Sequence, residues 1–273
     1  DRDSMKRIEF SWFEGKAGAL TSSWDDGTIH DRRLVGIFNQ SGLKGTFNLN
    51  SGRFGDEPKG WHARVSASEV KLLYEGHEVA CHSVTHPSLQ ELADDQIRAE
   101  LLEDRRQLER LVGYPVRGMA LPNGSWDHRV LRIAKECWIV YSRPVTRHGG
   151  FTLPLDFMDW HTTTHHKTDL AALWQKFMES GRPSKLFYLW GHSYEFDQDK
   201  NWPLIEDFAA LAGNADNVWQ ATNMQVYEYV MAWRNLQFSV DMDQVRNTSH
   251  LTLWYALGGA ILMIKPGETV EIV

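Results

Sequence analysis

Short apolar runs alternate with longer amphipathic stretches along most of the chain. The runs are bounded by Gly, Asn, Asp or Pro, which is typical of strands, and they predict strands at 19–24, 45–49, 78–81, 118–121, 138–141, 157–160, 185–190 and 218–221. The stretches between them show helical spacing of apolar residues or helix start and stop signals. They predict helices at 31–41, 66–76, 90–112, 128–136, 168–180, 202–212 and 222–236.

Strand–helix alternation of this kind favours a mostly parallel sheet whose strands are joined by crossover helices. The chain has about eight such strands and no glycine-rich phosphate loop, so an α/β barrel is predicted rather than an open nucleotide-binding sheet.

The pattern changes after Arg234. Runs at 236–240, 250–255, 259–264 and 269–273 predict strands with no helices between them, separated by turn residues such as Gly258-Gly259 and Pro266-Gly267. We therefore expect a barrel over residues 1–235 and a small antiparallel β extension over residues 236–273 that packs on the barrel.

The charge balance limits the kinds of partner. A net charge of −7 argues against a broad phosphate-binding surface, so nucleic acid is not expected as a partner. No apolar run reaches membrane-spanning length, and the first residues lack the apolar core of a signal peptide. This pattern fits a cytoplasmic protein or the mature form of a secreted one, and it leaves the oligomeric state open. The two cysteines, Cys81 and Cys137, make no disulfide framework.

Polar clusters follow several of the predicted strands. The first is Asp25-Asp26-Gly27, directly after the strand at 19–24. Two neighbouring carboxylates repel each other and ionise together at low cost only when a cation is near. A metal site is one interpretation of this pair, and an ordinary Asp-Asp-Gly turn is the other.

Two histidines four residues apart, His82 and His86, follow the strand at 78–81. Together with an aspartate from the other strand end they would supply three ligands and leave one position open for water, as in catalytic zinc sites. Polar loop histidines are the alternative. Zinc is the predicted metal, although Co²⁺, Ni²⁺, Mn²⁺ or Fe²⁺ can occupy the same kind of site.

Two further clusters end predicted strands, one at residues 156–160 and one at Leu189-Trp190-Gly191-His192. Barrel enzymes place their chemistry at the carboxyl ends of the strands, so we expect the four clusters to face one cleft. Trp160 and Trp190 lie within these clusters, and such aromatic side chains either fill the core or stack on sugar rings.

The motifs Trp24-Asp25-Asp26-Gly27 and His82-Ser83-Val84-Thr85-His86, in this order, resemble those of the polysaccharide deacetylases of carbohydrate esterase family 4, which share the NodB homology domain. The resemblance covers roughly residues 19–222 and implies an irregular parallel (β/α) barrel. It also implies that Asp25 is the catalytic base and that Asp26, His82 and His86 bind one divalent metal.

The family's fourth motif is Asp-x-x-Asp-Trp, whose last aspartate orients the histidine of the final motif, the general acid. The resemblance assigns these roles to Asp159 and His192. With these assignments, we expect the substrate to contact a set of residues near the strand ends, namely Pro122, Asn123, Trp160, Leu189 and Trp190.

Two positions depart from the family pattern. Ala120 stands where the third motif usually has an arginine that tethers the base, and Arg117 is a nearby substitute. Gly191 stands where the final motif usually has a second leucine, which changes the pocket expected to hold the acetyl methyl group. These departures indicate a divergent subgroup and bear on the substrate more than on metal binding.

Other polar residues near the motifs allow two interpretations. His161, His165 and His166 form either a second metal site or a polar rim. Glu195, just after His192, either contacts substrate or caps its loop.

The predicted function is a metal-dependent hydrolase that removes N- or O-linked acetyl groups from a sugar or polysaccharide. Hydrolysis of another small amide or of a cyclic ureide on the same barrel is one alternative. A glycan-binding homologue with weakened catalysis is the other.

Overall fold

The computed structural model describes residues 7–55 and 62–272. Parallel strands form one curled sheet in the order β6-β5-β4-β3-β2-β8-β7, and β9 pairs with β2 beside this path. This arrangement confirms the α/β barrel predicted from the sequence. The strands are β2 (Gly18–Asp25), β3 (Thr46–Leu49), β4 (Glu78–Cys81), β5 (Gly118–Ala120), β6 (Tyr141–Arg143), β7 (Thr164–His165), β8 (Leu186–Gly191) and β9 (Val218–Gln220).

The central strand β2 is buried on both faces, and its two faces differ in character. Leu20 and Trp24 join the hydrophobic layer that the sheet shares with the surrounding helices. The alternate residues, including Ser23 and Asp25, point to the other side because successive strand residues face opposite ways. There they meet polar side chains from neighbouring strands, so the barrel interior is hydrophilic near the carboxyl end of β2.

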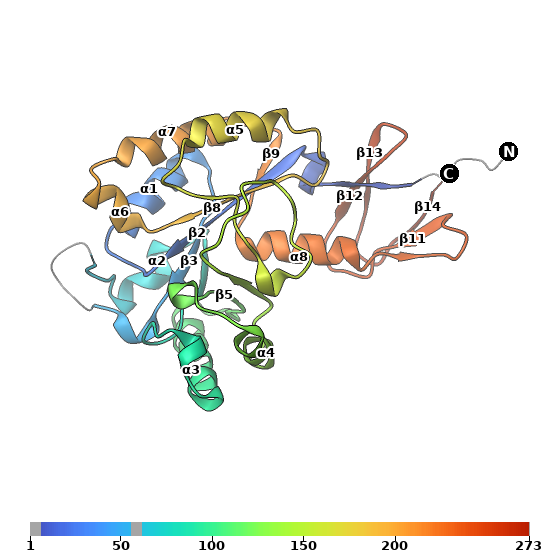
Figure 1. Ribbon diagram of the computed structural model, residues 1–273. Coiled ribbons are helices and arrows are strands. Elements are labelled where there is room, and N and C mark those ends of the chain that lie inside the picture. The colour runs from blue at the N-terminus through green and yellow to red at the C-terminus, as the bar shows by residue number, and fades with distance from the viewer. Residues whose placement is uncertain (1–6, 56–61, 273) are drawn as a thin grey trace.

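Helices cover the outside of the sheet (Figure 1). Their amphipathic sequences place apolar residues against the strands, as Leu34, Val35 and Phe38 show in the first helix. The helices are α1 (Asp31–Ser41), α2 (Val70–Leu73), α3 (Asp94–Val112), α4 (His128–Glu136), α5 (Leu170–Glu179), α6 (Ser193–Gln198), α7 (Trp202–Gly213) and α8 (Asn223–Arg234).

An antiparallel extension follows α8 and projects to one side of the barrel (Figure 1). It contains two three-stranded sheets, β1-β12-β13 and β10-β11-β14. Its strands are β1 (Glu9–Ser11), β10 (Gln237–Phe238), β11 (Gln244–Arg246), β12 (Leu253–Leu257), β13 (Ala260–Ile264) and β14 (Thr269–Glu271). The extension therefore takes one strand from the N-terminal end of the chain, and the division at residue 235 stays a prediction. Val273 and residues 1–6, which the sequence predictions included, lie outside the described residues.

The structure corrects several predicted boundaries. Trp138 has a φ of 59° and is 66% exposed, so the strand predicted at 138–141 begins only at Tyr141. The run at 157–160 is not a strand but a 3₁₀ turn, Phe157–Asp159, and the neighbouring strand is β7. The helix predicted at 90–112 begins at Asp94, after a separate 3₁₀ turn. Strands β1 and β11 were not predicted, because short exposed strands carry little hydrophobic pattern.

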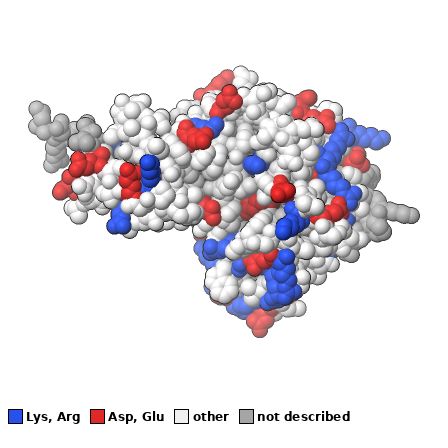
Figure 2. Space-filling model, turned by 180° about the vertical axis from the view of Figure 1, so that it is seen from behind, with Lys and Arg blue, Asp and Glu red and all other residues white. Residues whose placement is uncertain are grey.

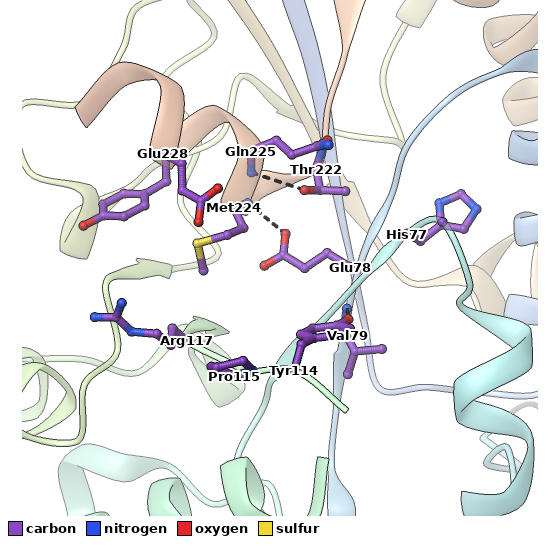
Figure 3. A pocket seen from close by; sticks show the side chains of 12 residues that line it. His77, Glu78, Val79, Tyr114, Pro115, Arg117, Thr222, Met224, Gln225 and Glu228 are labelled. Atoms are coloured by element: carbon purple, nitrogen blue, oxygen red, sulfur yellow. Dashed lines mark hydrogen bonds between the residues drawn. The ribbon is translucent and has the colours of Figure 1, made fainter. Parts of the chain in front are cut away.

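A pocket lies at the amino end of β4, where side chains of β4, of the turn before β5 and of α8 meet (Figure 3). The buried Glu78 carboxylate in it accepts hydrogen bonds from the backbone N–H of Met224 (2.8 Å), from Thr46 (2.8 Å) and from Tyr141 (2.6 Å). It thereby accepts one of the N–H groups in the first turn of α8, which have no partner inside the helix. Because His82 follows the opposite end of β4, this pocket is separate from the predicted site.

The surface seen from behind carries acidic and basic side chains interspersed over the barrel (Figure 2). No helix in the described part of the chain combines the length and the apolar character that a bilayer crossing requires.

Candidate metal centre and active site

Asp26, His82 and His86 converge at the carboxyl end of the barrel, as predicted. Asp26 Oδ1 lies 3.6 Å from His82 Nε2 and 3.5 Å from His86 Nε2. Asp26 has a φ of 83°, in the left-handed region. Because the backbone turns in this way, the carboxylates of Asp25 and Asp26 both lie close to the His82 imidazole. His86 also has a positive φ, 65°. Such strained conformations are held only where the surrounding structure requires them, which is common at functional sites.

His82 is oriented by two hydrogen bonds. Its Nδ1–H donates to the backbone oxygen of Ala120 (2.8 Å), which leaves the lone pair of Nε2 facing Asp26. Its backbone N–H donates to Asp104, a fully buried carboxylate on α3 (3.0 Å). A hydrogen bond on the far nitrogen is the usual way in which metal-binding histidines are held.

The three side chains fit one divalent cation. Within residues 7–55 and 62–272, the buried Asp26 Oδ1 has no hydrogen-bond partner, although a buried carboxylate oxygen normally has one. One ligand atom from each residue lies within 4.8 Å of the other two, and the His₂Asp donor set suits zinc. The cation identity stays a prediction.

Asp25 is anchored through one oxygen and free at the other. Its Oδ1 accepts from Asn48 Nδ2 (2.9 Å) and from Arg143 Nη2. Its Oδ2 lies 4.0 Å from His82 Nε2, on the side of the candidate metal ligands. Burial alone would raise the pKa of Asp25, but Arg143, helped by His82 and His192, outweighs burial and lowers the pKa to about 2. Asp25 is therefore ionised at neutral pH.

Arg143 supplies the arginine that is missing at Ala120. It ends β6, is fully buried, and also donates through Nε to Ser23 (3.0 Å). Arg117, the substitute suggested by the sequence, instead donates to the backbone oxygen of Trp138 on the exposed side of the chain. Arg143 was not predicted as a site residue, and the available signal was an arginine directly before Pro144 at the end of an apolar run.

His192 lies beside the candidate metal ligands, with Nε2 3.9 Å from Asp26 Oδ2. Its Nδ1–H donates to Glu195 (3.1 Å), which follows three residues later at the start of α6. Burial alone would lower the pKa of His192, but Glu195 and then Asp25 and Asp26 outweigh burial and raise the pKa. Glu195 therefore favours the protonated form of the proposed acid.

The structure does not bring Asp159 to His192. Asp159 Oδ1 lies 3.0 Å from His161 Nε2 instead. The reason is local: residues 157–159 form a 3₁₀ turn rather than the end of an inward-facing strand. Glu195, rather than Asp159, is therefore the carboxylate that is placed to orient His192.

The glycine at position 191 makes room for a histidine. A Cβ on Gly191 would lie 2.1 Å from His166 Nδ1 and 3.1 Å from the Trp24 ring. His166 is fully buried, and burial, followed by the neighbouring His165, lowers its pKa to about 3, so the ring is neutral. The departure from leucine at this position is therefore matched by an imidazole that fills the space.

The predicted substrate contacts divide into two groups. Trp190 lies at the site, with its ring 4.6 Å from the Arg143 guanidinium and 5.6 Å from the His192 ring. Trp160 is instead a core residue, packed against Tyr188 and other aromatic rings. Leu189 also faces away, into the hydrophobic layer beneath the helices, because it alternates with Trp190 along β8.

Pro122 and Asn123 form a 3₁₀ turn directly after β5, the strand whose Ala120 carbonyl holds His82. Asn123 has a φ of 57°, and its side chain donates to Ser88 (3.2 Å). Their contact with substrate stays a prediction.

Of the histidines weighed for a second metal, only His165 belongs to a second group of possible ligands. His165 Nε2, His192 Nδ1 and a Glu195 oxygen come together there. Lys167 lies 3.1 Å from the other Glu195 oxygen. The Glu195 carboxylate thus already lies close to four polar side chains, those of His165, His166, Lys167 and His192.

Residues 14–141 match the family model described as polysaccharide deacetylase. A curated relative, the peptidoglycan-N-acetylglucosamine deacetylase of Bacillus cereus, is 27% identical over 139 residues, which are 46% of this chain and 47% of that protein. The alignments span less than half the length of the curated relatives.

Two solved structures show the same fold. A Mycobacterium smegmatis protein assigned to the polysaccharide deacetylases has a TM-score of 0.62 and 18% identity, covering 84% of this chain and 95% of its own. A Bacillus anthracis pseudoenzyme of carbohydrate esterase family 4 has a TM-score of 0.50 and 21% identity, covering 78% and 65%. At sequence identities this low, the similarity to these structures supports only the assignment of the fold.

The close contact at Gly191 gives a direct test of the packing. Gly191→Ala is expected to lower the free energy of unfolding by about 1–3 kcal/mol, because the new methyl group would overlap the His166 ring. Chemical denaturation followed by circular dichroism measures this change.

The matched control is the same substitution in a His166→Ala background, where the ring is absent. There Gly191→Ala should cost less than about 0.5 kcal/mol, since sites in contact are coupled. An equal cost in both backgrounds would contradict the account of this glycine.

Proposed function

Because residues 14–141 match the polysaccharide deacetylase family model, we propose that the chain is a metal-dependent hydrolase that removes acetyl groups from a sugar or polysaccharide. One observation carries this proposal. An ionised carboxylate with one free oxygen, Asp25, lies beside the convergent group of Asp26, His82 and His86. A purely structural metal site would not need a base at this position.

The proposed metal, Zn²⁺ or a related divalent ion, would act as a Lewis acid on the acyl carbonyl and activate water for attack. Asp26, His82 and His86 would hold it, and the hydrogen bond from His82 to Ala120 keeps the required tautomer.

Asp25 acts as the general base through its free Oδ2. The other oxygen is held by Arg143 and Asn48, so the carboxylate cannot rotate away from the site. Arg143 is in turn fixed by Ser23 and by the ring of Trp190. A positioned base of this kind contributes about 10²–10⁴-fold to the rate.

His192 acts as the general acid toward the leaving amine or alcohol. Its Nε2 faces the metal ligands, while Nδ1–H is bound to Glu195. A carboxylate on Nδ1 favours the charged imidazolium, which is the form that can donate a proton.

Acetate release tests the function directly. The zinc-loaded protein is expected to release acetate from members of a panel of N- and O-acetylated sugars and oligosaccharides, and to stop when a chelator removes the metal. Enzymatic acetate determination measures the product. Small amides and a cyclic ureide belong in the panel, because turnover of these alone would identify a different hydrolase on the same barrel.

Asp25→Asn is the matched variant for this assay. It should retain metal by elemental analysis while kcat falls by about 10²–10⁴-fold. Full activity in this variant, or no acetate from any acetylated carbohydrate with the metal-loaded protein, would contradict the proposal.

The pH profile tests the acid. Because Glu195 raises the pKa of His192, the protonated acid persists to higher pH than it would without this carboxylate. Glu195→Gln should therefore move the basic limb of the kcat/KM profile to lower pH. Asp159→Asn is the control and should leave that limb in place, since Asp159 pairs with His161. If Asp159→Asn shifted the basic limb and Glu195→Gln did not, Asp159 rather than Glu195 would be the carboxylate that supports His192.

A further inference from the structure

Three buried side chains, those of Thr28, Asp31 and Ser193, form a hydroxyl–carboxylate link between the loop after Asp26 and the residue after His192. Ser193 Oγ–H donates to Asp31 Oδ1 (2.5 Å), and the hydroxyl oxygens of Thr28 and Ser193 lie 3.0 Å apart. A serine hydroxyl has one hydrogen to donate, so Thr28 is the donor to Ser193. All three residues are 0% exposed. Because water does not reach these hydrogen bonds, the link is strong and rigid.

The link lies where the backbone pairing of two neighbouring strands has ended. The last pair in register between β2 and β8 is Trp24 with Gly191. Asp26 and His192 follow this pair, so the β2–β8 ladder does not set the 3.9 Å between Asp26 Oδ2 and His192 Nε2. The hydroxyl–carboxylate link connects the two segments again, at the start of α1 and the start of α6 (Figure 1).

Asp31 is the fixed end of the link. It is the first residue of α1, and its second oxygen, Oδ2, accepts from the hydroxyl of Tyr74 at the end of α2 (2.6 Å). Burial raises the pKa of Asp31 to about 7, although the hydrogen bonds from Ser193 and Tyr74 favour the ionised form. Because α1 and Tyr74 hold the carboxylate in place, Ser193 is bound to a fixed acceptor.

The link and Glu195 hold different parts of His192. Glu195 accepts from Nδ1–H, which sets the tautomer and the orientation of the ring. Ser193 is the next residue in the chain, so its hydrogen bond to Asp31 fixes the backbone from which the ring projects. A general acid needs both, because its donor atom must come within hydrogen-bond distance of the leaving group.

We propose that Thr28, Asp31 and Ser193 are positioning residues for the general acid. Through the backbone of His192 they hold Nε2 beside the proposed metal centre, within reach of the leaving group. This inference rests on the role of His192 in the proposed function. The alternative is a role in stability alone, since a carboxylate in the first turn of α1 also interacts favourably with the helix dipole.

Two acetyl substrates separate these roles. An acetylated sugar has an amine or alkoxide leaving group that needs protonation, whereas the nitrophenolate of a nitrophenyl acetate departs without it. Ser193→Ala should lower kcat for the sugar by about 10- to 100-fold, because a misplacement of about 1 Å has an effect of this size. The same variant should change kcat for the nitrophenyl ester by less than about threefold. Steady-state kinetics of the zinc-loaded protein measures both rates.

Two variants of Thr28 test the other end of the link. Valine has nearly the shape of threonine but no hydroxyl, so Thr28→Val should also slow the sugar selectively. Thr28→Ser keeps the hydroxyl and should stay within about threefold of the wild-type kcat. Thr46→Val is the control, since Thr46 donates to the buried Glu78 carboxylate at the amino end of the barrel (2.8 Å). It loses a similar bond and should keep both rates.

The effect should also depend on His192. In a His192→Ala background, Ser193→Ala should not slow the sugar further, because residues that act as a unit are not additive. The inference would be overturned if Ser193→Ala left the sugar rate unchanged or slowed both substrates equally. It would also be overturned if Ser193→Ala had its full effect in the absence of His192.

The inference can fail separately from the proposed function. Turnover of acetylated sugars without a selective loss in Ser193→Ala would overturn the inference and leave the deacetylase function standing. If the metal-loaded protein turns over no acetylated sugar, crystal structures of the wild type and of Ser193→Ala decide whether the link positions His192. A ring displaced by about 1 Å or more in the variant supports the inference, and an unchanged ring overturns it.

Discussion

The structure depends on how two adjacent carboxylates are accommodated at the end of one buried strand. Asp25 is 3% exposed and the Asp26 side chain 11% exposed, so water screens their repulsion weakly. The chain treats them differently. Asp25 is matched by the buried Arg143. The buried oxygen of Asp26, in contrast, has no hydrogen-bond donor among the described residues and faces two imidazole nitrogens. A cation between Asp26 and the imidazoles would offset the negative charge of Asp26, as Arg143 offsets that of Asp25.

The groups that support this pair come from other parts of the barrel than the family motifs suggest. The arginine that holds Asp25, the proposed base, is on β6 rather than β5, and the carboxylate that holds His192 is Glu195 rather than Asp159. Parallel strands in a barrel bring all their carboxyl ends to one rim, so a side chain from one strand end can replace a side chain from another. The residues proposed to react stand at their motif positions, whereas the side chains that hold them come from other positions.

Much of this arrangement could be predicted from the sequence, because it depends on local patterns. The apolar runs predict the parallel strands, and Asp25-Asp26 with His82 and His86 predict the group of candidate metal ligands that the structure brings together. Periodicity could not separate a buried 3₁₀ turn from a short strand at 157–160, so Trp160 was misplaced from the core to the pocket. Long-range pairs such as that of Arg143 with Asp25, 118 residues apart, have no local signal.

A crystal structure of the zinc-loaded protein, with data collected on both sides of the zinc absorption edge, tests the central claim most directly. We predict one anomalous peak within bonding distance of Asp26, His82 and His86, with Asp25 still held by Arg143. A peak located instead among His165, His192 and Glu195, or no peak at Asp26 in crystals grown with zinc, would contradict the account.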